Sequence, residues 1–430
     1  KCALVEIFVG REECCETLME HGDLMSNRND TRHILFIAAP EIEGGATKSM
    51  YGLCKRLIET GEYRCTVLTS QHSWLNDDLE AIGARTVVTR HAAFLVPKPS
   101  TWWKVLPKYI IYLIKYLYGL LISTRIAESA VDFSEVDIIH TNVPRNDLGI
   151  ILARRHGIPH VIHLRECSFT HFRCWSYRPS PVRYLNSGAD LFIAISDFVR
   201  KYWEGLGISD DKVRLVYNGV TPPRVIQRYQ SVFETSDTPL KVLFLGGYVE
   251  AKGIWDPVRA ALLVNARHPK SLVLDVYGGG SPEIRREVMR FVEEHEAGNF
   301  IRLHGPLSDV WPEISAHDIG LACSTDEAFG RIVIEYQACG TVPVVSSSGA
   351  FPELVQDGIN GLVYEKSQGE HSLAECLFRL VEDREKVLTL SASALKAAEG
   401  FTAERNCEEV QAIYDEILRQ APRNKETAAN

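Results

Sequence analysis

The sequence predicts an α/β protein with two domains, each built on a parallel sheet, and three observations lead to this fold class. The chain has 430 residues, which is enough for two separately buried cores. From His33 onward, short apolar runs alternate with segments of helical periodicity, the pattern of strands joined by crossover helices. A stretch rich in proline, serine and threonine, residues 221–239, divides these runs into two series.

The first series predicts one domain. Its expected strands are residues 33–39, 65–69, 85–88, 137–140, 160–164, 191–195 and 213–216. Because helical patterns lie between them, we expect the strands to run parallel.

The second series predicts another domain of the same kind. Its expected strands are residues 241–245, 272–276, 300–303, 318–323, 342–345 and 361–364. Three helical stretches close the chain, the last from about residue 402 to 418. The predicted division is an extension at 1–30, a first domain at 31–220, a linker at 221–239, a second domain at 240–400, a helix at 401–420 and a tail at 421–430. Ligands of such domains bind at the carboxyl ends of the strands, here in a cleft between the two sheets.

Composition argues against nucleic acid as a partner. Aspartate and glutamate total 56 against 47 for lysine and arginine, and the net charge of −9 gives no general attraction to a polyanion. Apart from the adjacent pair Cys14 and Cys15, the eleven cysteines are scattered and lack the spacing of zinc or redox sites, so we expect reduced, structural cysteines.

Residues 1–30 differ from the rest of the chain. They have no clear periodicity and carry three of the cysteines, so we expect a poorly ordered extension, with Met25 as a natural start. They also lack a basic region followed by an apolar stretch and a small-residue cleavage site, which predicts a cytoplasmic protein.

Two glutamates, Glu327 and Glu335, form the most informative motif. Residues 318–324 indicate a buried strand and residues 331–339 a helix entered through Gly330, which places Glu327 on the loop and Glu335 one turn inside the helix. At about 1.5 Å rise per residue the two are roughly 8 to 12 Å apart, about the distance from the sugar to the ribose of a nucleotide-diphosphate sugar. The diphosphate would lie over the helix N-terminus, where N–H groups and the helix dipole favour anions.

Further motifs carry a resemblance to a known family. The stretch from Glu327 to Leu362 resembles family-4 retaining glycosyltransferases, which have the GT-B fold and include many bacterial enzymes of cell-surface polysaccharide synthesis. Supporting motifs stand in the family's order, and they are Gly44-Gly45, Ile195-Ser196, Asn218-Gly219-Val220, Lys252-Gly253, Tyr277-Gly278-Gly279-Gly280, Gly349, Pro352-Glu353 and Asn360-Gly361. The resemblance covers residues 33–418. It implies two Rossmann-like domains with parallel sheets facing a cleft, and a C-terminal helix that returns toward the N-terminal domain.

The resemblance implies a donor site in the second domain. Glu327 would bind hydroxyls of the donor sugar together with Ala328, Phe329 and Gly330, the last two through their backbone N–H groups. Glu335 would bind the ribose diol. A carboxylate accepts two hydrogen bonds from a vicinal diol, which agrees with both roles. Local capping or ion pairing of either glutamate is the structural alternative.

Lys252, on the loop after strand 241–245, looks like the family lysine that neutralises the diphosphate of the donor. The family usually has an arginine five residues earlier, where this chain has Gly247. We hypothesise that Arg331 or another cation substitutes, because a diphosphate held without a metal ion needs more than one positive group.

Gly44 and Gly45 follow the first strand and precede a helix. Backbone N–H groups there can approach the diphosphate without a Cβ in the way. The next residues, Ala46-Thr47-Lys48-Ser49, lack the Gly-Lys-Ser order of a P-loop, so a nucleoside triphosphatase is not expected.

At the end of strand 160–164, Arg165 occupies the place where many relatives carry a catalytic-site histidine. We therefore place it in the catalytic set with Glu327 and Lys252. His163 is expected on the same face of the strand, and Glu166 is interpreted as a cleft residue that touches sugar or acceptor. A buried ion pair is an equal alternative for Glu166.

The resemblance also implies the course of the reaction. Retaining hydrolases use two carboxylates about 5 Å apart, and Glu327 and Glu335 are too far apart for that. The implied reaction is a front-face transfer in which the leaving diphosphate accepts the proton of the acceptor hydroxyl, so that catalysis rests on positioning and electrostatics. The chain has no D-x-D motif. We expect no metal ion and no cofactor, with the nucleotide-diphosphate sugar as donor substrate.

Residues 97–126 combine basic and aromatic side chains without an acid. Lys104, Lys108 and Lys115 share one helical face, and the uninterrupted apolar part is predicted to be too short to span a bilayer. An aromatic, basic amphipathic segment favours docking on an anionic membrane surface. A core helix with a solvated basic edge is an alternative of equal standing.

Three functions are therefore considered. The first is a hexosyltransferase that adds a sugar to a cell-surface glycan or a lipid-linked precursor. The second is a nucleotide-sugar-binding accessory subunit with little activity, suggested by Gly247 and Arg165. The third is an enzyme of soluble sugar metabolism, against which the basic aromatic segment favours the first. The nucleotide base, sugar, acceptor and linkage stay open.

Overall fold

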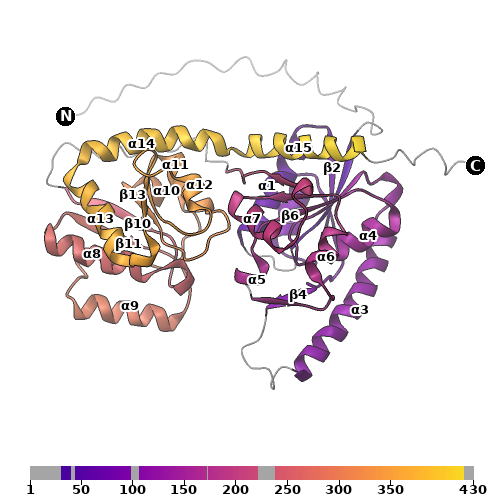
Figure 1. Cartoon of the computed structure of the whole chain (residues 1–430), viewed down its shortest axis with the longest axis horizontal. Coiled ribbons are helices and arrows are strands. Elements are labelled where there is room, and N and C mark those ends of the chain that lie inside the picture. The colour runs from indigo at the N-terminus through magenta and orange to yellow at the C-terminus, as the bar shows by residue number, and fades with distance from the viewer. Residues whose placement is uncertain (1–30, 40–43, 98–105, 172, 221–237, 421–430) are drawn as a thin grey trace, which may run out of the picture.

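A computed structural model of the chain describes residues 31–39, 44–97, 106–171, 173–220 and 238–420. The predicted extension, the tail and most of the predicted linker lie outside the described residues. Two α/β units lie side by side, and two long helices, α14 (Arg384–Ala398) and α15 (Ala403–Gln420), run along the same side of both (Figure 1).

The first unit is built on a seven-stranded parallel sheet with the order β3-β2-β1-β5-β6-β8-β9. Its strands are β1 (Arg32–Ile37), β2 (Tyr63–Thr69), β3 (Arg85–Val88), β5 (Ile138–Thr141), β6 (His160–Leu164), β8 (Leu191–Ala194) and β9 (Val213–Leu215). Its helices are α1 (Gly45–Glu59), α2 (Trp74–Ala81), α3 (Leu106–Ala130), α4 (Leu148–His156), α5 (Ser168–His171), α6 (Pro181–Asn186) and α7 (Asp197–Leu206).

The second unit is built on a six-stranded parallel sheet with the order β12-β11-β10-β13-β14-β15. Its strands are β10 (Leu240–Phe244), β11 (Leu272–Val276), β12 (Ile301–Leu303), β13 (Ile319–Ala322), β14 (Val342–Ser346) and β15 (Leu362–Tyr364). Besides α14, its helices are α8 (Trp255–Arg267), α9 (Pro282–Glu294), α10 (Trp311–Ser315), α11 (Arg331–Cys339), α12 (Phe351–Leu354) and α13 (Gly369–Glu382).

The predicted strands are confirmed, each within two residues of its expected ends. Strands such as β8 and β13 are apolar and buried throughout, because helices cover both faces of a parallel sheet. In each sheet the strand order reverses beside the first strand, between β1 and β5 and between β10 and β13. Ligands of open α/β sheets bind at such reversal points, outside the carboxyl ends of the strands.

The helix α15 returns to the first unit, as expected. Its buried face carries Cys407, Val410, Ile413, Tyr414 and Ile417, which pack in one apolar cluster with strands of the first sheet. The start of α15 packs closely against Gly219 of the first unit. A Cβ on Gly219 would stand 2.5 Å from the Cα of Ala403, so only glycine fits there.

Polar contacts join the two units. The carboxylate of Glu353 accepts hydrogen bonds of 2.7 Å from the backbone N–H groups of Asp197 and Phe198, at the start of α7. The hydroxyl of Ser196 donates to the carbonyl of Ala328 over 2.6 Å. These bonds hold the loop before α11 against the first unit.

One small element is absent from the sequence prediction. The strands β4 (Leu95–Pro97) and β7 (Cys174–Ser176) form a two-stranded antiparallel sheet. Three residues are too few to show the alternation by which a strand is recognised.

The predicted basic segment, residues 97–126, overlaps the helix α3 from residue 106 onward. Lys98, Trp102, Trp103 and Lys104 lie outside the described residues. By length and composition alone, residues 110–130 could cross a membrane, so the expectation that the apolar part is too short is wrong on that criterion.

Candidate functional site

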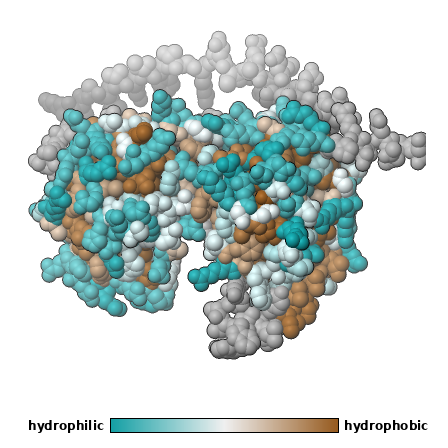
Figure 2. All heavy atoms as spheres, viewed as in Figure 1, coloured by the Kyte–Doolittle hydropathy of each residue, from teal (hydrophilic) through white to brown (hydrophobic). Residues whose placement is uncertain are grey.

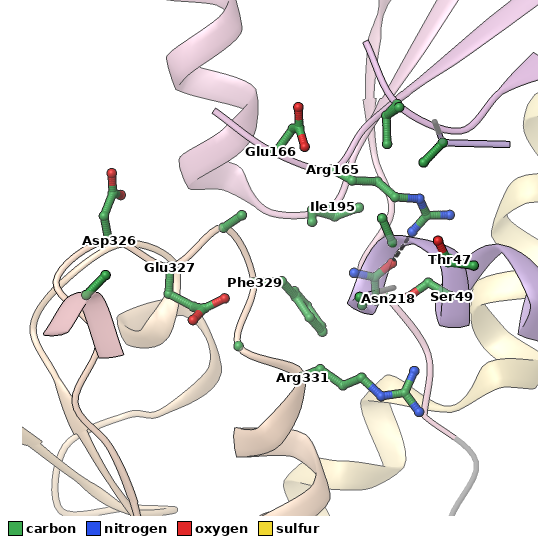
Figure 3. Close-up of a pocket in the computed structure, with 18 of the residues that line it drawn as sticks. Thr47, Ser49, Arg165, Glu166, Ile195, Asn218, Asp326, Glu327, Phe329 and Arg331 are labelled. Atoms are coloured by element: carbon green, nitrogen blue, oxygen red, sulfur yellow. Dashed lines mark hydrogen bonds between the residues drawn. The ribbon is translucent and has the colours of Figure 1, made fainter. Parts of the chain in front are cut away.

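A cavity of about 740 Å³ lies between the two units, at the carboxyl ends of both sheets. Figure 3 shows Glu327 on one side of this space and Arg165 with Asn218 on the other. The cavity walls include Gly44, Gly45, Thr47, Ser49, Arg145, Arg165, Glu166, Arg173, Ile195 and Asn218 from the first unit, and Ala251, Lys252 and residues 325–331 from the second. Its size is that of a pocket for a ligand as large as a nucleotide sugar.

The cavity is locally positive in an acidic protein. Five cationic side chains, Arg145, Arg165, Arg173, Lys252 and Arg331, line it with three carboxylates, Glu166, Asp326 and Glu327. The helices α1 and α11 both begin at this cavity, through Gly45 and Arg331. Helix N-termini add partial positive charge, so the site favours an anion such as a diphosphate.

Backbone packing positions Glu327. Gly349 has φ of +61°, and a Cβ on it would stand 2.3 Å from the carbonyl oxygen of Glu327. The N–H of Ala350 donates to the same oxygen over 2.9 Å. The side-chain oxygen Oε2 of Glu327 accepts two hydrogen bonds. One comes from Nζ of Lys252 over 2.7 Å and the other from Oγ of Ser324 over 3.1 Å. The carboxylate is therefore held at the cavity wall by the groups around it.

A tight turn brings Lys252 to this carboxylate. Lys252 is the last residue of the short 3₁₀ turn Glu250–Lys252, and Gly253 follows it with φ of +74°. A Cβ on Gly253 would stand 2.1 Å from the carbonyl oxygen of Cys323, so glycine is required for the turn to approach β13. The Lys252 side chain is 46% exposed, which leaves it accessible from the cavity.

Glu335 does not line the cavity. It lies on α11, and its carboxylate accepts a hydrogen bond of 2.8 Å from Nε of Arg331, one turn earlier. The exposed fraction is 12% for the Glu335 side chain and 32% for that of Arg331, which does line the cavity. The local pair considered as an alternative for Glu335 is therefore present, and it presents Arg331 to the site.

Gly247 has a steric reason to be glycine. Its φ is +64°, and a Cβ would stand 2.3 Å from the carbonyl oxygen of Gly279. In the same way, a Cβ on Gly278 would stand 2.6 Å from the Cα of Gly247. An arginine cannot occupy this position without moving both loops. Gly247 is not among the residues that line the cavity.

Arg165 is the best-buried cation of the cavity wall apart from Arg145. Its Nε donates to Asn142 and one terminal nitrogen to Asn218, each over 2.7 Å. The second terminal nitrogen donates to Nδ1 of His163 over 3.2 Å. Burial lowers the pKa of Arg165 to about 9. Within the described part of the chain its hydrogen-bond partners are all neutral, and a bound anion would offset the cost of burying this charge.

His163 does not reach the cavity, contrary to expectation. Its side chain is fully buried behind Arg165, and its Nδ1 lies 3.2 Å from Nε2 of His140. His140 Nδ1 in turn lies 2.6 Å from the hydroxyl of Tyr414 on α15. An arginine can only donate, so Nδ1 of His163 is an acceptor, which requires Nε2–H on His140 and donation from Tyr414. The C-terminal helix thus supports Arg165 through two neutral histidines.

Replacing Tyr414 with phenylalanine should destabilise the protein and reduce activity. The change leaves the buried Nδ1 of His140 without a donor, which costs about 1 to 3 kcal/mol of unfolding free energy in a urea titration. Because His140 and His163 orient Arg165, we also expect a severalfold lower kcat. Tyr336→Phe is the matched control, since it removes a buried hydroxyl bonded to Leu321 in the second unit. An equal kcat in both variants would contradict the supporting role.

Glu166 lines the cavity but is already paired. Its Oε1 lies 2.6 Å from Nε of Arg145, and it accepts a hydrogen bond of 2.8 Å from Ser168. Both charged side chains of the pair are at most 10% exposed. The buried ion pair considered as an alternative for Glu166 is therefore present. The carboxylate forms part of the cavity wall, but its Oε1 is already occupied by Arg145 and Ser168.

Sequence reasoning missed several wall residues. Arg145 and Asn218 follow strands of the first sheet, and Arg173 precedes β7. Thr47 and Ser49 lie in the first turns of α1, in the segment considered only as a failed P-loop. Polar residues directly after each strand would have pointed to Arg145 and Asn218, because those strand ends meet at one edge. No group of three histidine, cysteine, aspartate or glutamate side chains in the described ranges is placed to hold a metal ion.

Comparisons with known proteins agree with this geometry. Residues 43–224 match the family model described as Glycosyltransferase Family 4, and residues 239–383 match the model described as Glycosyl transferases group 1. An uncharacterized glycosyltransferase of Methanocaldococcus jannaschii is 22% identical over 298 residues, 68% of this chain and 79% of that protein. A D-inositol 3-phosphate glycosyltransferase of Thermobifida fusca is 24% identical over 337 residues, 72% of this chain and 75% of that protein.

Solved structures show the same fold. HepE of Anabaena in complex with UDP has a TM-score of 0.68 at 18% identity, covering 90% of this chain and 100% of that one. A glycosyltransferase of Rickettsia africae has a TM-score of 0.69 at 19% identity, covering 91% and 99%. The expected GT-B fold, two Rossmann-like domains facing a cleft, is confirmed.

Proposed function

We propose that this chain, a glycosyltransferase of the family-4 type, transfers a sugar from a nucleotide-diphosphate donor to a hydroxyl of a cell-surface glycan or its lipid-linked precursor. The transfer retains the anomeric configuration and uses no metal ion. The protein acts in the cytoplasm, at the inner face of the cell membrane. The observation that carries the donor assignment is the positive cavity, where Glu327 and Lys252 stand opposite Arg165 between the starts of α1 and α11.

The wall suits each part of such a donor. A diphosphate fits between Lys252 and the starts of α1 and α11, where charge and N–H groups converge. A sugar on the β-phosphate would meet Glu327, whose carboxylate accepts hydrogen bonds from hydroxyls. HepE of Anabaena has been solved with UDP and with UDP-glucose, which supports a uridine nucleotide as the first donor to test.

The cations of the wall support a reaction without a metal. The cavity has an excess of two positive side chains, and these can stabilise the charge that develops on the departing diphosphate. Glu327 is held by Lys252 and Ser324 beside the sugar position, where it stabilises positive charge on the sugar. The leaving diphosphate then accepts the acceptor proton on the face from which it departs.

A ligand screen followed by a turnover assay tests the proposal. UDP, GDP, ADP and their sugars are compared by thermal shift, because a ligand that binds only the folded state raises its melting temperature. The donor that binds is then incubated with the protein, and release of the nucleoside diphosphate is measured. Slow hydrolysis of one donor is expected. Binding without any release would favour an accessory subunit, and no shift with any of them would exclude donor binding.

Replacing Arg331 with alanine should weaken binding of the diphosphate. Loss of a charge-assisted hydrogen bond costs about 1.5 to 3 kcal/mol, roughly a tenfold to hundredfold higher Kd in calorimetry. The effect should fall on UDP and not on uridine, because the arginine would contact the diphosphate, which uridine lacks. Arg405→Ala breaks a similar pair with Glu409 on α15 and serves as control. Unchanged UDP affinity in Arg331→Ala would remove this arginine from the site.

A further inference from the structure

The helix α3 presents an apolar face to solvent. Ile110, Ile111, Ile114, Leu117, Tyr118 and Leu121 are between 49% and 66% exposed. Their spacing, with neighbours three and four residues apart, places them on one side of the helix. Figure 2 shows the corresponding brown surface at the end of the molecule where α3 projects beyond its sheet. An apolar surface of this size marks an interaction site.

The opposite face of α3 is fixed to the first unit. Tyr116 is 3% exposed and donates to Asp147 over 2.5 Å, and Arg178 contacts both groups, with Nε 3.0 Å from the same carboxylate oxygen. The ring of Tyr177 stacks on that of Tyr116 at 5.3 Å. Farther along, Ser123, Thr124 and Ala127 are buried as well. The helix therefore cannot leave the first unit to become surrounded by lipid without breaking these contacts.

The outward apolar face is too short to cross a bilayer. It runs from Ile110 to Leu121, about 17 Å at 1.5 Å per residue, against about 30 Å of hydrocarbon. Beyond it the exposed positions are polar, at Arg125, Glu128 and Ser129. The length and composition of α3 permit a membrane span, but the burial pattern fits a helix that enters one leaflet only.

Charge on this segment selects a kind of lipid. The sequence from residue 98 to 127 contains five basic residues and no acid, in a protein of net charge −9. Of these, Lys115 and Arg125 are exposed on α3. Basic residues beside an apolar face are attracted to anionic headgroups. A second copy of this chain, which has the same positive segment, would meet repulsion there.

The same end of the first unit connects to the candidate site. Residues 98–105 link α3 to β4, and β4 pairs with β7, which begins directly after Arg173 in the cavity wall. A membrane at α3 would bring a lipid-linked acceptor to the unit that carries Arg173. This link to the acceptor rests on the proposed function, whereas lipid binding by α3 does not.

We propose that α3 is a monotopic membrane helix, which seats the residues Ile110 to Leu121 in one leaflet of an anionic bilayer while Tyr116 keeps it anchored on the first unit.

Vesicle co-sedimentation of the full chain, without donor, tests this. Phosphatidylcholine vesicles with and without phosphatidylglycerol are compared. We expect binding that increases with phosphatidylglycerol and falls roughly tenfold or more in Ile114→Glu and in Leu117→Glu, since each places a charge where an apolar side chain would be buried. Ile359→Glu, at a 59% exposed position of the second unit, is the matched control and should bind as the unchanged protein does.

Two results would overturn the proposal. One is a lack of sedimentation with either vesicle, or equal binding by Ile114→Glu and Ile359→Glu. The other is self-association in gel filtration that Ile114→Glu abolishes without any effect on vesicles, which would assign the face to a second copy. All these positions are exposed, so circular dichroism melts should coincide. Donor hydrolysis in solution should be unchanged in Ile114→Glu, which separates failure of this inference from failure of the proposed function.

Discussion

Replacing Arg165 with methionine is expected to lower kcat/KM for sugar transfer by about a hundredfold to a thousandfold, the usual effect of removing a group that stabilises developing charge. The guanidinium is 7% exposed, lines the cavity and is oriented by Asn142 and Asn218. Its hydrogen-bond partners in the described structure are neutral, so the charge remains available to a phosphate or an acceptor anion. Methionine fills a similar volume without the charge.

The assay is release of nucleoside diphosphate at varied donor and acceptor concentrations. Arg165→Lys keeps a charge but lacks the planar fork whose separate nitrogens reach Asn142, Asn218 and His163, so an intermediate rate is expected. Arg214→Met is the control, because Arg214 belongs to the same unit and pairs with Glu416 outside the cavity. Activity of Arg165→Met within about twofold of the unchanged protein would remove Arg165 from the reaction.

Acidification from pH 7 to pH 5 is expected to unfold the protein. Four fully buried histidines, His91, His140, His160 and His163, have pKa values lowered by burial, to about 4 for His91 and His160. In the unfolded chain each titrates near 6.5. Between about pH 6.5 and 4 the unfolded state therefore binds more protons, and stability falls as the pH falls. At pH 5.5 His91 and His160 alone remove roughly 3 kcal/mol of unfolding free energy, and His140 and His163 lower it further, which is a large part of the stability of many domains.

Urea titrations at a series of pH values measure this dependence. The slope of unfolding free energy against pH should correspond to several protons near pH 5.5, and His33, with a pKa lowered by burial to about 4, also contributes to it. In His91→Gln it should fall by about one proton, because that side chain no longer titrates. His72→Gln is the control, since the His72 side chain is 68% exposed. A flat profile between pH 7 and 5 would contradict neutral, buried histidines.

The fold was largely predictable because its two parallel sheets are buried on both faces. Such strands appear in the sequence as uninterrupted apolar runs, and helices between them give the opposite periodicity. The start of α11 was also readable, since Gly330 precedes an apolar helical pattern. The pair of β4 and β7 was not, because three residues carry no period. The sequence predicted an aromatic, basic amphipathic segment in α3, but it could not show which side chains face solvent, because that depends on which side Tyr116 anchors.

The candidate site was predictable where a local motif carries it and not where distant residues meet. Glu327, Lys252, Gly44 and Arg165 all line the cavity. The contact of Arg165 with Asn218 joins positions 53 residues apart, and Tyr414 reaches His140 across 274 residues. Such pairs depend on how the strands and α15 pack, which no local pattern encodes. For the same reason the sequence could not decide whether Glu166 engages Arg145, whereas the pair of Arg331 and Glu335, four residues apart on α11, is local and was among the alternatives.

A crystal structure of the protein with UDP bound would show directly where the donor lies. We expect the diphosphate between Lys252 and the first residues of α1 and α11, within hydrogen-bond distance of the backbone N–H of Gly330 or Arg331. Nucleotide bound elsewhere, with Lys252 and Glu327 directed away from it, would contradict this placement.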